Sequence, residues 1–198
     1  MKRMEQLDEI NSLLFRFSKL GINKSLLGAT LIGKAPHIAP EAWLNCIYPV
    51  ISSNEIEALE QEIGIKMPSS YVMFLNTFSN GLTVLTDTLC LFGKRAFFNR
   101  SNTEYVRQPY DIVNINKYER PKNASDEMLF IGSYDWDGSY LYMMPDQTVH
   151  FCHRKDATSL YSWESLYTML IDEIKRLYGL FDSNGVQIDE TVPTVPSL

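Results

Sequence analysis

The sequence has no long run of apolar residues, since no stretch reaches the roughly 18 residues that a membrane-spanning helix needs. Its N-terminal segment, MKRMEQLDEINSLL, carries acidic residues where a signal peptide would have its apolar segment. Cysteine is also scarce: Cys46, Cys90 and Cys152 are three in number and widely spaced, which does not suggest a disulfide framework. We therefore expect a cytoplasmic protein that does not enter a membrane and keeps its mostly buried thiols reduced.

The sequence has fewer basic than acidic residues. The 198 residues include 18 Lys and Arg against 24 Asp and Glu, for a net charge of -6 and a pI near 5.1. Such an acidic chain is not expected to bind the phosphate backbone of a nucleic acid. The acid is concentrated in residues 48–198, which hold 12 basic and 20 acidic residues, whereas residues 1–47 hold 6 and 4. A basic protein partner fits this composition better.

Complete catalytic motifs are missing as well. The chain has no G-x-S-x-G sequence of the kind that presents a nucleophilic serine. Residues 28–34 have the spacing of a phosphate-binding loop, which ends in Gly33 and Lys34. However, Ala35 stands where a Ser or Thr hydroxyl would ligate magnesium, and Pro36 follows where the phosphate-facing helix should begin. The sequence therefore predicts no catalytic residue.

Two groups of residues resemble metal-binding patterns, but both patterns are incomplete. Asp135 and Asp137 have the spacing of half a calcium-binding loop, but Met144 stands where the bidentate glutamate belongs. A second group contains side-chain types that bind zinc, without further ligands that the sequence can locate: His150, Cys152 and His153. We expect neither a metal nor another cofactor.

Residues 1–47 begin with a clear helical pattern. Apolar residues recur every three or four positions over residues 4–20, which predicts an amphipathic helix that ends at Gly21. Its apolar stripe would pack on the rest of this chain, on a second copy or on a partner. Glycines and prolines then predict loops, with at most a short helix over residues 41–47. We interpret residues 1–47 as an N-terminal helical extension.

Residues 48–182 contain a second group of elements. Ser52 and Glu55 form a capping box for a helix that ends at Gly64, and Pro68 begins another helix that ends at Asn80. Strands are predicted over residues 82–86, 89–92, 128–132, 140–144 and 149–153, and a long loop with one strand near residues 111–115 is predicted over residues 94–127. A closing helix, capped by Ser162, reaches residue 179, and residues 183–198 read as a loose tail. This order predicts an α+β fold with an antiparallel sheet flanked by helices.

The same residues resemble the SUKH superfamily, which includes the Smi/Knr-type regulators of fungal cell-wall synthesis. The resemblance rests on the acidic capped helix, the Met67-Pro68 step in place of Leu-Pro, the second helix and Asn80-Gly81. It continues through residues 130–132, the following hairpin and the last helix, and it covers roughly residues 48–180. Ser139 follows Gly138 where the family tends to have Gly-Asp. Any role of that aspartate is therefore not carried over, although Asp135 and Asp137 lie nearby.

The resemblance implies a binding module rather than an enzyme. Bacterial members are mostly immunity proteins, each of which neutralises a toxin, often a nuclease, and fungal members are regulatory interaction proteins. We therefore expect a non-catalytic immunity protein that occludes a basic toxin. One alternative is an intracellular regulator or scaffold of the fungal kind. A less favoured alternative is a metal-assisted hydrolase that uses Asp135, Asp137, His150 and His153. The sequence does not indicate an oligomeric state.

Candidate partner-binding residues lie in three places. Tyr134, Asp135, Trp136 and Asp137 are expected in a turn between two strands, where aromatic rings and carboxylates alternate. The alternative for Trp136 is a lid that folds back on the core. Further acidic candidates, with ordinary solvated surface as their alternative, are Asp146 in the next turn and Glu55 and Glu62 on the acidic helix.

Overall fold

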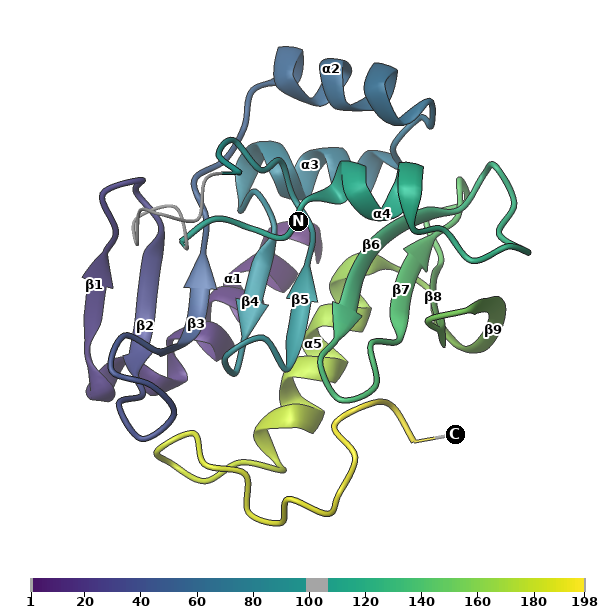
Figure 1. The fold of residues 1–198 in the computed structure, drawn as a ribbon. Helices are drawn as coiled ribbons and strands as arrows, with labels where there is room; N and C mark the ends of the chain where they lie inside the picture. The colour runs from purple at the N-terminus through teal and green to yellow at the C-terminus, as the bar shows by residue number, and fades with distance from the viewer. Residues whose placement is uncertain (1, 99–106, 198) are drawn as a thin grey trace.

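The computed structural model describes residues 2–98 and 107–197. Within these residues one antiparallel sheet runs through the molecule, and its nine strands lie side by side in chain order (Figure 1). The strands are β1 (Ile22–Lys24), β2 (Thr30–Lys34), β3 (Trp43–Ile47), β4 (Leu82–Val84), β5 (Leu89–Leu91), β6 (Leu129–Tyr134), β7 (Tyr140–Met143), β8 (Val149–His153) and β9 (Asp156–Trp163). The expected α+β class with an antiparallel sheet is confirmed.

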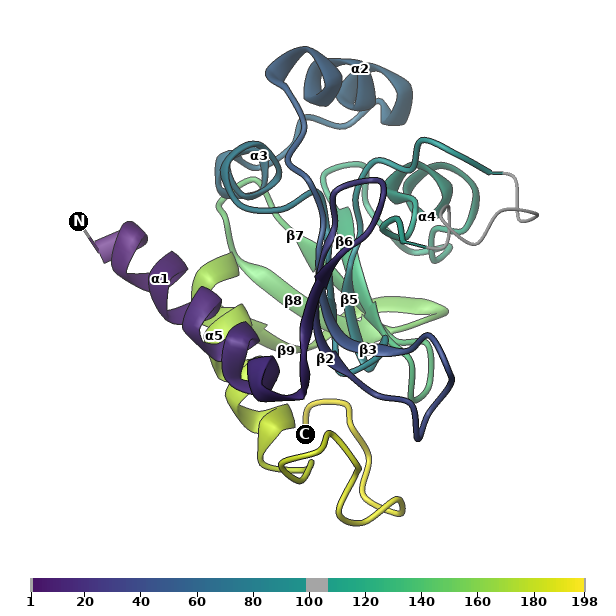
Figure 2. The same ribbon diagram turned by 90° about the vertical axis from the view of Figure 1, so that its left-hand side faces the viewer.

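Helices cover both faces and one end of this sheet (Figure 2). On one face lie α1 (Lys2–Leu14), which continues as the 3₁₀-helix η1 (Phe15–Leu20), and α5 (Leu166–Tyr178). The other face carries α4 (Ile112–Tyr118), while α2 (Ser53–Ile63) and α3 (Ser69–Thr77) lie at one end of the strands. Among the described residues, no helix has the length and apolar character needed to cross a membrane.

The first 47 residues form an integral part of the sheet, which corrects the expectation of loops and a short helix over residues 41–47. The expected helix there is strand β3, which pairs with β2 and with β4. Buried Asn45 on β3 donates to the Leu14 carbonyl at 2.8 Å and to the Tyr178 hydroxyl at 2.7 Å, and its own oxygen accepts from Leu85 N at 3.1 Å. In short strands that contain glycine, the alternation of apolar and polar residues is too brief to distinguish a strand from a loop.

The amphipathic N-terminal helix packs on its own chain. Ile10 and Leu14 of α1 are fully buried, and Phe17 makes an edge-to-face contact with Tyr178 of α5 at 5.1 Å between ring centroids. Lys175 of α5 is paired with Glu9 of α1 at 2.5 Å. The sequence left open whether the apolar stripe packs on this chain, on a second copy or on a partner. The structure shows that it packs on the rest of this chain.

Helices α2 and α3 follow the sequence pattern closely. The capping box is present, because Ser52 accepts from Glu55 N while Glu55 accepts from Ser52 N, and α2 ends at Gly64 in the left-handed conformation. Pro68 is the residue before α3 rather than its first residue. Gly81 follows at a φ of 83°, where an added Cβ would lie 2.7 Å from the Leu91 carbonyl oxygen. Only glycine fits this approach of two backbones.

Three later expectations are wrong in detail. Residues 112–118 form helix α4 instead of a strand, because Asp111 accepts from Val113 N as an N-cap and the buried Asn116 side chain bonds with the backbone of Phe130 on β6. The last helix is capped by Ser165, and Ser162 belongs to strand β9. Residues 183–198 are not a loose tail throughout, because Thr194 is buried and its carbonyl oxygen accepts a hydrogen bond from Arg176 at 2.6 Å.

Candidate partner-binding site

A cavity of about 780 Å³ opens on the sheet face that carries α4, opposite α1 and α5. Its floor is a row of neighbours across three strands, since Cys90 on β5 pairs with Ser133 on β6, which pairs with Tyr140 on β7. Residues directly opposite one another in a sheet project from the same face, and this register therefore places three side chains beneath one opening. Asn114 and Ile115 of α4 form part of its wall.

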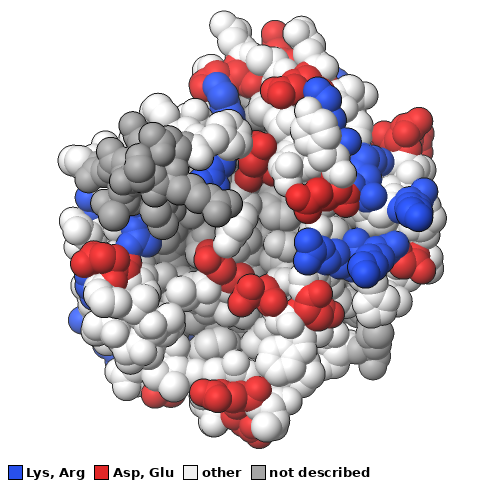
Figure 3. All heavy atoms as spheres, viewed as in Figure 1, with Lys and Arg blue, Asp and Glu red and all other residues white. Residues whose placement is uncertain are grey.

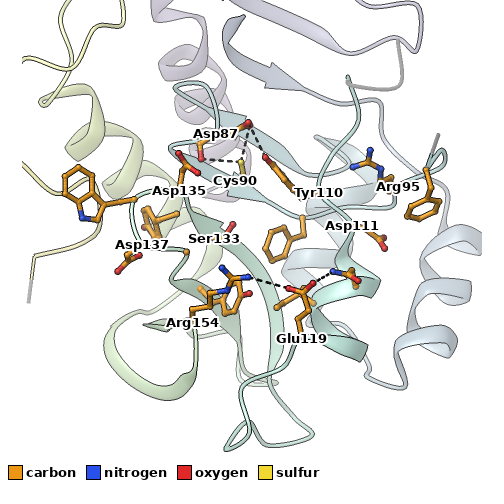
Figure 4. Close-up of a pocket in the computed structure, with 18 residues that line it drawn as sticks. Asp87, Cys90, Arg95, Tyr110, Asp111, Glu119, Ser133, Asp135, Asp137 and Arg154 are labelled. Atoms are coloured by element: carbon orange, nitrogen blue, oxygen red, sulfur yellow. Dashed lines mark hydrogen bonds and ion pairs between the residues drawn. The ribbon is translucent and has the colours of Figure 1, made fainter. Parts of the chain in front are cut away.

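The turn between β4 and β5 supplies an acidic group at one end of the cavity. Leu85, Thr86 and Asp87 all have positive φ, between 50° and 76°, which is unusual for residues other than glycine. Asp87 accepts a hydrogen bond from Tyr110 at 3.2 Å and one from the Cys90 thiol at 3.5 Å. Figure 4 shows these bonds, with Asp135 beside them. The turn therefore holds the Asp87 carboxylate in a fixed position at the cavity wall.

The surroundings of the Asp87 carboxyl act on its pKa in both directions. Burial raises the pKa of the Asp87 carboxyl, the hydrogen bonds from Cys90 and Tyr110 lower it, and the neighbouring charge of Asp135 raises it again. Burial and the nearby Asp87 also raise the pKa of the Cys90 thiol well above its ordinary value. The thiol at the floor is thus protonated at neutral pH, a state in which it is a poor nucleophile.

Exposed aromatic rings surround the opening. Phe98, Tyr110 and Trp136 line the cavity and remain 68%, 46% and 44% exposed. Large rings left in water at the edge of a cavity are typical of a surface that binds another molecule. At the opposite end Arg154 approaches Glu119 at 4.0 Å, and Asn114 donates to Glu119 at 2.6 Å. Acidic side chains gather around a hollow in this face (Figure 3).

The predicted turn at residues 134–139 splits between the core and this cavity. Asp135, Trp136 and Asp137 are exposed and line the cavity. Tyr134 is only 1% exposed and donates a hydrogen bond of 2.6 Å to buried Glu173 on α5, so its side chain is turned into the core and away from the surface that a partner would meet. The interpretation of Trp136 as a lid over the core does not fit its exposure.

The other acidic candidates lie elsewhere. Asp146 follows β7, whereas the turn at residues 135–137 precedes it, and the two therefore lie at opposite ends of that strand. Asp146 accepts from Thr148 within its own turn. Glu55 and Glu62 are on α2, where Glu55 is engaged by Ser52 and by Lys94 at 2.8 Å. Of the seven candidates, the four in the turn at residues 134–137 line the cavity, and three of them are exposed there, whereas Tyr134 is buried.

The histidine and cysteine group on β8 is engaged in local contacts. His150 bonds with Thr148 at 2.9 Å and with Ser159 at 2.8 Å, while Cys152 is fully buried and burial raises the pKa of its thiol to about 12. His153 is exposed. In the described part of the chain, no three His, Cys, Asp or Glu side chains are grouped so that they could hold a metal ion.

Sequence reasoning missed Asp87 and Tyr110. Asp87 and Thr88 stand between two predicted strands, which was a usable signal for an exposed turn. Tyr110 carries no comparable signal, because it lies in a polar segment whose path is set by a bridge between Gly93 and Asp111. The pairing of these two residues depends on the folded chain.

Comparison with known proteins places the chain in a family. No curated protein matches it closely enough to be called a relative. The sequence model described as the SMI1 / KNR4 family (SUKH-1) matches residues 50–172, from just before α2 into α5. Because this match spans more than half of the chain, the protein belongs to the SMI1/KNR4 family, SUKH-1.

Proposed function

We propose that this protein is an immunity protein that binds a protein toxin with a basic surface and neutralises it by occlusion. Family membership supports a binding module, and immunity is the role that the resemblance implies for bacterial members. The observation that carries the proposal is the cavity itself, with exposed aromatic rings at its opening and carboxylates on its walls. The proposal assigns no catalytic step to the chain and places it in the cytoplasm, where its buried thiols stay reduced.

The composition of this surface suits tight binding of a cationic protein. Tryptophan and tyrosine are enriched among the few residues that contribute most to protein–protein affinity, because they bury a large area with few rotatable bonds. Asp87, Asp135 and Asp137 line the same cavity as Tyr110 and Trp136, and the Tyr110 hydroxyl donates a hydrogen bond to Asp87. Carboxylates in such a setting accelerate encounter with a basic partner and disfavour acidic ones. An acidic surface of this kind would cover the basic cleft with which a nuclease holds its substrate.

The test is whether the chain neutralises a toxin, for which the neighbouring genes are the first place to search. The toxin domain is expressed in a bacterial host with and without the full-length chain, and growth is recorded. We expect growth to be restored, and we expect the purified proteins to elute together in size-exclusion chromatography. Continued killing at equal expression of the folded chain, with separate elution of the two proteins, would refute the proposal.

A further inference from the structure

We infer that the cavity accepts an arginine side chain of the toxin, with its guanidinium group against Asp87 and Asp135 and its stem between Tyr110 and Trp136. This inference rests on the proposed function and names the chemical group that the same site recognises. It follows from the charge at one end of the cavity, from the aromatic rings that line the same cavity and from the cavity's volume.

The charge comes from two neighbouring carboxylates. Asp87 and Asp135 lie side by side at the same end of the cavity (Figure 4). Among the described residues, Arg107 acts on Asp87, and it directs its guanidinium group to the Glu41 carbonyl oxygen. Arg154 lies beside Glu119 at the other end. An incoming cation would therefore relieve the repulsion between these two carboxylates.

The rings favour a guanidinium group over an ammonium group. Tyr110 and Trp136 both line the cavity and are about half exposed, with relative exposures of 46% and 44%. A planar guanidinium group stacks on aromatic faces and donates to carboxylates in pairs, whereas lysine acts as a compact, strongly hydrated charge. Arginine is also enriched among the residues that dominate binding energy at protein interfaces. An anionic ligand is disfavoured by the excess of carboxylates on the walls.

The acidic end is arranged before any ligand arrives. The left-handed turn at residues 85–87 and the hydrogen bond from Tyr110 hold the Asp87 carboxylate in place. A fixed acceptor loses little conformational freedom when a ligand binds. The cavity, at about 780 Å³, is larger than one side chain, and the arginine is therefore expected to enter on a loop whose backbone crosses the opening.

The experiment titrates the full-length protein with N-acetyl-L-arginine N-methylamide and follows the tryptophan indole N–H signals by NMR. Trp43 and Trp163 are 8% and 6% exposed and serve as internal references for the exposed Trp136. The neutral control is the citrulline analogue of the probe, which has nearly the same shape and no charge. A lysine analogue tests the preference for guanidinium. We expect the Trp136 signal alone to shift, and only with the arginine probe at millimolar concentration.

The variant is Asp87→Asn combined with Asp135→Asn, because asparagine tolerates the positive φ at position 87. We expect the affinity for the arginine probe to fall at least tenfold. The matched control is Glu5→Gln combined with Asp8→Asn, which removes the same charge from exposed positions on α1, on the opposite face of the sheet, and should leave the affinity unchanged. Thermal unfolding of both double variants checks that each is folded.

The outcomes separate this inference from the proposed function. Neutralisation of the toxin without a charge-dependent shift of Trp136, or equal loss in both double variants, would overturn the arginine site and leave the proposed function standing. A stronger response to the lysine analogue would overturn the choice of arginine. Binding of the probe by a chain that fails to neutralise the toxin would refute the proposed function while supporting the arginine site.

Discussion

The Tyr134 hydroxyl donates a hydrogen bond of 2.6 Å to the buried carboxylate of Glu173, which links strand β6 to helix α5. Two residues later, Trp136 is 44% exposed at the edge of the cavity. The chain thus passes from the core to the proposed binding surface within one turn. Substitutions at these two positions should separate stability from binding.

Tyr134→Phe should destabilise the protein without affecting toxin binding. The variant removes one of the bonds that Glu173 receives and leaves those from Arg176, which lie at 2.6 to 3.2 Å. Loss of a buried bond to a charged group costs about 1.5 to 3 kcal/mol. Urea unfolding measures the loss, and a binding assay at a temperature where both proteins are folded checks affinity. Unchanged stability together with weaker binding would place Tyr134 at the interface after all.

Leu14→Ala should reduce stability through the packing of α1 on α5. Leu14 is fully buried, and truncation of such a leucine costs about 2 to 5 kcal/mol, whereas Met4→Ala on the same helix changes a side chain that is 72% exposed. Deletion of residues 1–22 should likewise lower the melting temperature and expose apolar surface to a dye. Equal melting temperatures for Leu14→Ala and Met4→Ala would show that this helix contributes nothing to folding.

Glu55 should contribute pH-dependent stability. Hydrogen bonds from Lys94 and then from Ser52 lower the pKa of this carboxyl from 4.5 to about 2. Because the folded-state pKa is the lower one, the contribution is present above pH 4.5 and is lost as the pH falls towards 2. The residue is partly exposed, so Glu55→Gln should cost about 1 kcal/mol or less at pH 7 and nothing near pH 2. Urea titrations at both pH values measure the free energy of unfolding, with Glu57→Gln as the control. A larger loss of stability for Glu55→Gln near pH 2 than at pH 7 would contradict this prediction.

Removal of divalent metal ions should leave the fold intact. The described residues contain no group of three metal-ligating side chains, and His150 is already bonded to Thr148 and Ser159. We expect the same melting temperature before and after dialysis against a chelator. A fall of several degrees that zinc or calcium restores would revive the metal-dependent alternative.

The elements that sequence predicted best are those whose signals are local. A capping box at Ser52 and Glu55 and a turn at Pro145 each act through neighbouring residues, and the structure contains both the helix and the β7–β8 hairpin there. Helix α4 was mistaken for a strand because Ile112, Val113 and Ile115 are β-branched. Its helical state depends on Asp111 as a cap and on distant contacts with β6.

The candidate site was predicted only in part, because its residues meet through the sheet. An alternating aromatic and acidic turn indicates a surface, but it does not tell which of Tyr134 and Trp136 points into the core. The end of β6 decides this, because Tyr134 is the last residue of the strand and projects to the face opposite that of Ser133, towards α5, whereas Trp136 lies in the turn beyond the strand. Asp87 and Tyr110 are 23 residues apart and join the site only when the chain folds.

The central claim is that the cavity face binds the toxin, and the most direct measurement is the dissociation constant of the complex with Trp136→Ala. Tyr161→Ala is the control, because Tyr161 is 47% exposed and does not line the cavity. We predict that Trp136→Ala weakens binding by about 2 kcal/mol, roughly 30-fold, mainly through faster dissociation, while the free protein keeps its stability. Tyr161→Ala should bind as the wild type does. A folded Trp136→Ala variant with wild-type affinity would contradict the account.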